Sequence, residues 1–204
     1  MQTDAQIAGL LRYLDQKIGK GNYWFVLSGD HGVAPTLAQS RSFGLDAKNL
    51  DLKSALTTIS TALISRWGPG DWFVPEAGAT LNRETLAKYK VSVEEAARAA
   101  GEAAMTIDGI LGYVTAESAR APQSIAQAFR LSYFPDRGPD VFFVQQPFSL
   151  WNGDRGGTTH GTPYSYDTHV PLIFYGSAFH AGIYYENVST IDLAATLAAA
   201  LGIN

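Results

Sequence analysis

Two polar, glycine-rich loops hold the residues with metal-binding chemistry. Asp30 and His31 are adjacent in the first loop, directly after an apolar run. His160 stands in the second loop, within the segment RGGTTHG at residues 155–161. Carboxylate and imidazole groups are ligands that suit zinc, manganese or iron, and adjacent residues in an irregular loop can face one ion. Neighbouring glycines let the backbone approach a bound substrate closely. These three side chains are therefore candidate metal ligands.

Ordinary turn chemistry gives a second explanation for both loops. In a simple turn Asp bonds its own backbone, His is exposed and Gly takes a positive φ. The second loop could equally be a surface loop. It lacks the Lys of a phosphate-binding P-loop and the strand–helix setting of a dinucleotide fingerprint, which excludes both of those motifs. The loop residues by themselves leave metal binding and plain turns open.

Three further residues are weaker candidates for the same site. Asp167 can orient a ligand imidazole or cap the loop, and the sequence does not separate these roles. His169 follows the loop and precedes an apolar run, which favours a supporting or structural hydrogen bond over metal ligation. Arg155 can contact a phosphate through two parallel hydrogen bonds, although arginines in loops are more often solvated.

The elements around these loops indicate an α/β protein. Apolar residues at helical spacing over residues 7–18 predict a helix behind a capping box at residues 3–6. Residues 23–27 are continuously apolar, as in a strand covered on both faces in a parallel sheet. Loops at the carboxyl ends of such strands bind ligands. Residues 170–175 predict another buried strand, and a capping box at residues 189–192 predicts a last helix.

A less regular stretch separates the two parts of this core. Residues 36–138 are expected to form an inserted α+β subdomain, whereas residues 1–35 and 139–204 form the core. The insert's predicted helices cover residues 52–63, residues 124–133 and an alanine-rich stretch after a capping box at residues 92–95. Its predicted strands cover residues 71–74, 79–81 and 107–115, and the core resumes with a strand at 140–144.

Composition excludes several classes of function. The chain has 204 residues, 46% of them hydrophobic and 17% charged, with a net charge of -4. Such mild acidity, without blocks of like charge, argues against a nucleic-acid surface or an acidic-membrane surface. No apolar run approaches the roughly 18–20 residues of a membrane span. The first residues also lack a signal-peptide pattern. With no cysteine, any metal must use His and carboxylate ligands.

The segments around both loops resemble the alkaline phosphatase superfamily. The segment FVLSGDHG, residues 25–32, is similar to the metal-binding strand and loop of its nucleotide pyrophosphatase/phosphodiesterase branch. The segment GTTHGTPYSYDTHVPLIFYG, residues 157–176, resembles the bacterial phosphate-irrepressible (PafA-like) alkaline phosphatases, and residues 188–203 resemble their terminal helix. The resemblance spans the whole chain and is weakest in the insert. It implies the C-terminal half of a doubly wound α/β/α sandwich.

The resemblance also implies roles for the loop residues. Asp30 and His31 would ligate the zinc ion that activates a Thr or Ser nucleophile, and His160 would ligate a second zinc ion. The family's nucleophile, its other metal ligands and its phosphate-contacting residues have no counterpart before Asp30. We therefore expect part of a two-zinc phosphate-ester hydrolase, with partial zinc binding and no turnover by the isolated chain. The residues that separate monoesters from diesters are not in this chain.

A different class of function is a non-catalytic folded module that self-associates or binds a partner. Sheet edges and apolar surface that the rest of such a sandwich would cover favour a homodimer. In the enzyme hypothesis the partner is a phosphate ester, with no nucleic acid and no membrane. The parent family is typically periplasmic or secreted. Zinc content separates the two hypotheses.

Overall fold

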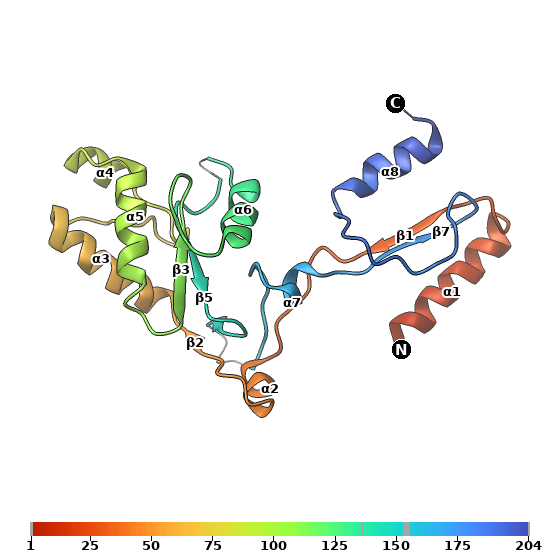
Figure 1. Cartoon of the computed structure of the whole chain (residues 1–204), viewed down its shortest axis with the longest axis horizontal. Coiled ribbons are helices and arrows are strands. Elements are labelled where there is room, and N and C mark those ends of the chain that lie inside the picture. The colour runs from red at the N-terminus through yellow and green to blue at the C-terminus, as the bar shows by residue number, and fades with distance from the viewer. Residues whose placement is uncertain (1, 136, 153–155, 204) are drawn as a thin grey trace. The chain divides into compact units, whose positions relative to one another are not determined.

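The chain forms two compact units in a computed structural model that describes residues 2–135, 137–152 and 156–203 (Figure 1). The terminal unit comprises Met1–Asp30 and Val170–Asn204, and the central unit comprises His31–His169. Among the described residues, the helices are all too short or too polar to cross a membrane.

The terminal unit is a two-stranded sheet with a helix from each end of the chain. Its helices are α1 (Gln2–Lys17) and α8 (Asp192–Leu201), and its strands are β1 (Phe25–Ser28) and β7 (Leu172–Tyr175). The strands pair antiparallel, with Phe25 opposite Tyr175. The Tyr23 hydroxyl donates to the Asp15 carboxylate at 2.9 Å, which ties α1 to the segment before β1. No described residue of this unit is buried, because two strands make too small a sheet to enclose a core.

Two expectations for the terminal unit are wrong. The run at residues 23–27 was expected to be buried on both faces of a parallel sheet, but it is half-buried and β1 pairs antiparallel. An apolar run indicates that both faces of a strand are apolar. It does not indicate whether the neighbouring strand is parallel or antiparallel. The capping boxes at residues 3–6 and 189–192 do not form either. Helix α1 already begins at Gln2, and the residue before α8, Ile191, has no side-chain cap.

The central unit is built on a three-stranded antiparallel sheet covered by helices (Figure 1). Strand β3 (Ile110–Val114) lies between β4 (Ala119–Arg120) and β5 (Phe142–Gln145). Helix α5 (Val93–Ala104) packs on β3 and against α3 (Leu52–Trp67).

The predicted start of α5 is confirmed. The Ser92 hydroxyl accepts the Glu95 N–H at 3.1 Å, as the capping box requires. The predicted helix at residues 52–63 lies within α3, and the one at 124–133 corresponds to α6 (Gln123–Ser132). Short elements were not predicted because one or two turns carry too little periodicity to be recognised: α2 (Leu37–Ser42), α4 (Arg83–Tyr89), α7 (Ser165–Thr168), β2 (Asn49–Leu50), β4 and β6 (Leu150–Trp151).

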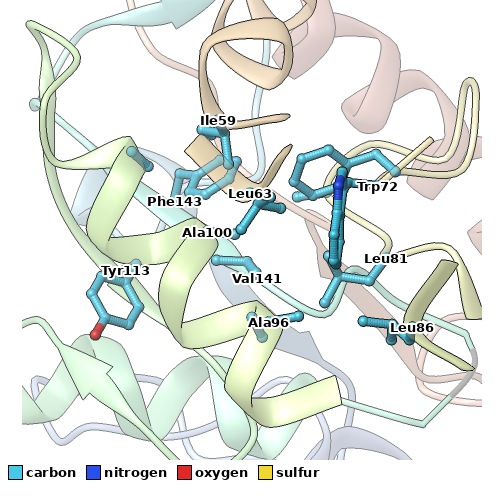
Figure 2. Packing of buried hydrophobic residues seen from close by; sticks show 14 of the residues in the cluster. Ile59, Leu63, Trp72, Leu81, Leu86, Ala96, Ala100, Tyr113, Val141 and Phe143 are labelled. Carbon is cyan, nitrogen blue, oxygen red and sulfur yellow. The ribbon is translucent and has the colours of Figure 1, made fainter. Parts of the chain in front are cut away.

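The hydrophobic core lies in the central unit, between α3, α5 and the sheet (Figure 2). Ile59 and Leu63 of α3 face Ala96 and Ala100 of α5, and Trp72 is enclosed beside them with 1% of its surface exposed. Small residues on α5 allow the two helices to approach closely. Complete burial of a large apolar side chain contributes roughly 1.5–3 kcal/mol. This unit therefore has its own source of stability.

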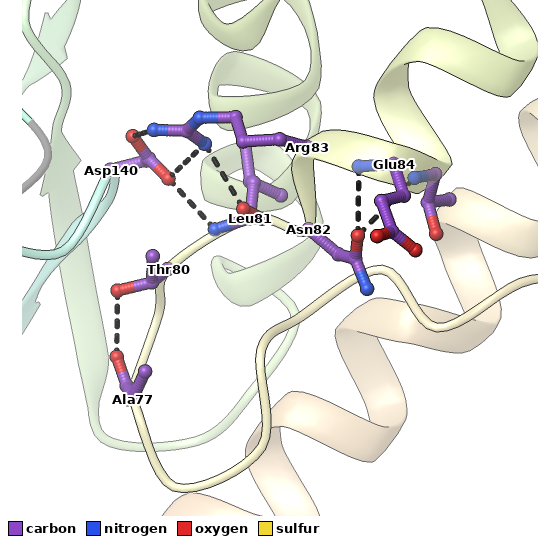
Figure 3. Close-up of polar contacts among 8 residues, drawn as sticks. Ala77, Thr80, Leu81, Asn82, Arg83, Glu84 and Asp140 are labelled. Carbon is purple, nitrogen blue, oxygen red and sulfur yellow. Dashed lines mark hydrogen bonds and ion pairs between the residues drawn. The ribbon is translucent and has the colours of Figure 1, made fainter.

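An ion pair between the half-exposed Arg83 and the buried Asp140 fastens the start of α4 to the segment before β5 (Figure 3). The two guanidinium nitrogens of Arg83 each donate to one oxygen of Asp140 at 2.8 Å. The Leu81 N–H donates to the same carboxylate at 2.7 Å. Because the Asp140 side chain is only 2% exposed, this bidentate contact compensates for the burial of its charge.

Contacts divide the chain after Asp30 and after His169. The division into a core of residues 1–35 and 139–204 with an insert of residues 36–138 stays a prediction. Strand β5 belongs to the central unit because it pairs with β3, and β6 does so because it pairs with β2. The apolar run at residues 140–144 correctly indicated a buried strand. It contained no information on which sheet buries that strand.

Candidate metal centre

Two loops of the central unit run side by side and carry His31 and His160. The Gly32 N–H donates to the Asp167 carbonyl at 2.8 Å. The Ala34 N–H donates to the Thr159 carbonyl at 3.4 Å, and the Thr158 hydroxyl donates back to the Ala34 carbonyl. These bonds join residues 32–34 to residues 158–167 across a long sequence separation.

The two loops approach each other closely at Gly32. A Cβ at this position would lie 2.0 Å from the Tyr166 carbonyl oxygen, which is far inside any real contact. Glycine is therefore required here for space. In the second loop, a Cβ on Gly157 would have no described atom within 4 Å apart from those of its two chain neighbours.

The two histidines stack against each other. The centroids of the His31 and His160 rings lie 3.5 Å apart, and the ring planes differ by 6°. Nδ1 of His31 lies 2.8 Å from the Gly32 carbonyl oxygen. Since a carbonyl oxygen only accepts, Nδ1 must carry the proton, and in the neutral ring Nε2 then keeps its lone pair. This arrangement is typical of metal-binding histidines, whose other ring nitrogen donates to a backbone carbonyl.

Parallel rings are better suited to two ions than to one. Ring-nitrogen lone pairs lie in the ring planes, so two parallel rings direct them in two separate layers. A single zinc ion about 2.0–2.1 Å from a nitrogen of each ring would lie well outside both planes. Two neighbouring ions, each held by one imidazole, stay a prediction. In two-metal phosphatases the ions lie about 3.5–4 Å apart.

The third candidate ligand, Asp30, is exposed and is the last residue of the terminal unit, next to His31 in the chain. Over the part of the chain that the structure describes, no three His, Asp or Glu side chains gather into a group that could hold a metal. The donor types and the His31 tautomer fit zinc, but the described ligands do not complete a site. Ligation by all three residues stays a prediction.

Asp167 caps the second loop. Its side chain is buried, and Oδ2 accepts hydrogen bonds from both the N–H and the hydroxyl of Thr162, each at 2.7 Å. Its other oxygen, Oδ1, is buried and has no hydrogen-bond partner among the described residues. One of the two roles left open by the sequence, loop capping, is therefore present in the structure.

The remaining predicted candidates are placed differently. His169 is exposed at the end of α7, where its backbone N–H donates to the Ser165 carbonyl at 2.9 Å. Its supporting role stays a prediction. Arg155 lies outside the described residues.

Two tyrosines that sequence reasoning missed anchor the second loop. The Tyr164 hydroxyl donates to the Gln145 carbonyl at the end of β5, and the Tyr166 hydroxyl accepts the Phe148 N–H at 3.1 Å. Burial raises the pKa of Tyr164, with a further contribution from Tyr166, so the phenol stays protonated and continues to donate. The available signal was two aromatic residues inside an otherwise polar loop.

The chain is similar in sequence to proteins named as alkaline phosphatases and as a calcium-transporting ATPase. No protein-family profile matches the chain. It is 32% identical over 213 residues to a calcium-transporting ATPase of Myroides odoratus. It is 23% identical over 208 residues to the alkaline phosphatase PafA of Elizabethkingia meningoseptica, and 23% identical over 207 residues to the alkaline phosphatase PhoV of Synechococcus elongatus. These alignments include 100% of this chain but only 37–38% of each relative.

Solved structures of an alkaline phosphatase also match almost the whole of this chain. The crystal structure of wild-type alkaline phosphatase PafA superposes with a TM-score of 0.85 at 25% identity, over 98% of this chain and 39% of that one. A mutant of the same enzyme superposes with a TM-score of 0.83.

Proposed function

From its homology to the C-terminal part of enzymes of the alkaline phosphatase superfamily, and its possession of their α/β fold, we propose that this chain supplies part of a two-zinc centre for phosphate-ester hydrolysis. The stacked His31–His160 pair carries the proposal. It joins two loops that are far apart in sequence, and the His31 tautomer leaves Nε2 able to bind a metal.

In this proposal each ligand has a defined partner ion. Asp30 and His31 hold one zinc ion and His160 holds the other. Two zinc ions supply Lewis-acid charge that stabilises the attacking and departing oxygens of phosphoryl transfer. The chain's own residues fix the two imidazoles side by side and keep the His31 proton on Nδ1, through the Gly32 carbonyl. A catalytic zinc ordinarily has three protein ligands, so further ligands must complete both sites.

The missing ligands and the nucleophile are assigned to sequence that this chain does not include. The chain spans about 38% of the length of the curated relatives it matches, so most of their length has no counterpart here. The relatives are named as phosphatases and an ATPase, and both names describe hydrolysis of a phosphate bond. We assign the same bond type to this chain, with no preference between monoesters and diesters, and a periplasmic or secreted location.

Zinc titration of the isolated chain tests the proposal. Calorimetry with zinc alone should give weak binding that is reduced in His31→Ala and in His160→Ala, because each variant loses the imidazole of one ion, and lost when both substitutions are combined. The matched control is His180→Ala, an exposed histidine in a different unit, which should bind as the parent does. Turnover of p-nitrophenyl phosphate by the chain alone should be absent. Zinc binding that survives both loop substitutions would refute the assignment of ligands.

One observation favours a second function, as a module that self-associates. The terminal unit exposes large apolar side chains, among them Ile183 at 80%, Tyr185 at 89% and Ile191 at 83%, and none of its described residues is buried. Such a surface lowers its free energy by meeting another apolar surface. Sedimentation equilibrium should then show association that increases with protein concentration and weakens in Ile183→Asp. A strictly monomeric chain at high concentration would exclude this alternative.

A further inference from the structure

We infer that Asp167 is the positioning residue of the centre proposed above: it holds the His31 loop with its backbone and the His160 loop with its side chain, and thereby sets the two imidazoles face to face. The inference rests on the proposed function only for its consequence on zinc affinity. The arrangement of the two rings can be measured without metal.

Asp167 connects the two loops through its carbonyl and its carboxylate. Its carbonyl accepts the Gly32 N–H at 2.8 Å, one residue after His31. Its Oδ2 accepts two hydrogen bonds at 2.7 Å from Thr162, two residues after His160. Hydrogen bonds to a carboxylate are about twice as strong as neutral ones. The other backbone link between the loops, from Ala34 to Thr159, is longer at 3.4 Å.

The turn closed by the carboxylate determines where the carbonyl points. Residues 162–167 form a short loop whose two ends meet at Thr162 and Asp167. Helix α7 has a single turn and no side-chain cap of its own. The Thr162 bonds therefore hold this turn in the conformation that presents the Asp167 carbonyl to Gly32. Without them the turn keeps its backbone bonds to the Tyr164 carbonyl but loses its closure at Thr162, so the Asp167 carbonyl can shift away from Gly32.

The second carboxylate oxygen explains why an acid, and not its amide, suits this position. Capping Thr162 requires one acceptor, which Asn also provides. Oδ1 is buried without a hydrogen-bond partner among the described residues, and an unsatisfied buried acceptor costs about 1–3 kcal/mol. A nearby positive charge offsets that cost. We therefore expect cation binding by the two loops to be stronger with Asp than with Asn at this position.

Imidazole NMR measures the positioning role directly. The chain has only four histidines, so their ring protons can be assigned with single His→Ala variants. The shift that the His160 ring imposes on His31 is the difference between the parent and His160→Ala, with no metal present. We expect Asp167→Ala to lose at least half of that shift and Asp167→Asn to keep it. The matched control is Thr168→Val, which removes a neighbouring side-chain bond to the Tyr164 carbonyl without touching either loop link.

Zinc affinity is the second measurement. Supporting partners of metal ligands typically contribute 10- to 100-fold in affinity, so Asp167→Ala should weaken zinc binding by at least tenfold. Asp167→Asn should weaken it by a smaller factor, and Thr168→Val should leave it unchanged. Should Asp167→Ala fail to fold by circular dichroism, Thr162→Val removes one of the two donors to Oδ2 and should reduce the His31 shift partially.

The outcomes separate the two proposals. An unchanged His31 shift in folded Asp167→Ala and Thr162→Val would overturn the positioning role. A lost shift in Asp167→Ala, in a parent chain that binds no zinc, would support the positioning role and count against the proposed function. Equal zinc affinity of the parent and Asp167→Asn would overturn the role of the second oxygen.

Discussion

Replacing Gly32 by alanine should separate the two loops that carry the histidines. The added Cβ would start 2.0 Å from the Tyr166 carbonyl oxygen, whereas real Cβ atoms stay beyond about 3.0 Å of such neighbours. The loops must therefore move apart by more than about 1 Å. Both groups belong to the backbone, so no side-chain rotation relieves the contact.

The size of the effect follows from the bonds that this movement breaks. A shift of about 1 Å lengthens the 2.8 Å bond from Gly32 to Asp167 beyond the range of a hydrogen bond. Its loss costs about 0.5–1.5 kcal/mol, and the strain of the added methyl group adds about 1–3 kcal/mol. We expect the central unit to lose about 1.5–4.5 kcal/mol of stability, the sum of the two costs. The displaced His31 should bind zinc at least tenfold more weakly, as for other lost supporting contacts.

Urea denaturation followed by circular dichroism measures the stability change, and the imidazole NMR described above reports the ring stack. Gly157→Ala is the matched control, because it adds the same methyl group to the second loop where no described atom apart from those of its chain neighbours lies within 4 Å. Its effect on stability should remain within about 0.5 kcal/mol. The reasoning is refuted if both variants have the same stability and the same His31 shift, because the loops would then not be in contact at Gly32.

Three further predictions concern the central unit. Gly101→Ala should destabilise the central unit by about 1–3 kcal/mol, because the new Cβ would lie 2.3 Å from the buried Tyr113 ring. This cost should outweigh the higher helix propensity of alanine. A variant that is more stable in urea denaturation would contradict this packing. Arg83→Met should cost roughly 2–4 kcal/mol in the same assay, because it leaves the buried Asp140 carboxylate without its ion pair; a loss below about 0.5 kcal/mol would mean that water replaces the guanidinium. Burial, reinforced by the Glu102 carboxylate, raises the pKa of Tyr113 to about 12. Folding favours the neutral phenol, so Tyr113 contributes to the free energy of unfolding as long as it is protonated. This stabilisation should be complete below about pH 10, where unfolded tyrosine titrates, and lost as the pH rises to about 12. Tyr113→Phe should flatten that alkaline decline in thermal melts, and an unchanged decline would assign it to other groups.

The sequence predicted those features of this protein that are set by residues close together in the chain, namely its longer helices, its apolar strands and its loop motifs. The sequence located α3, α5 and α6, and the Ser92 capping box gave the start of α5. Apolar runs located β1, β5 and β7. Motif similarity gave the α/β fold class and the relationship to the alkaline phosphatase superfamily, and the solved structures confirm both. All of these signals arise within a helix, a strand or a short loop.

Only the tertiary structure decided how these parts combine. Strand direction in the terminal unit and the assignment of β5 to the central unit depend on hydrogen bonds between distant segments, which leave no pattern in either segment alone. The same holds for the candidate site. The sequence named His31 and His160 as separate ligands, but their stacking depends on the space at Gly32 and on the bonds of Asp167. The effects of the Asp167 bonds and of the missing Cβ at Gly32 depend on the atoms that they contact, and the sequence does not show which atoms those are.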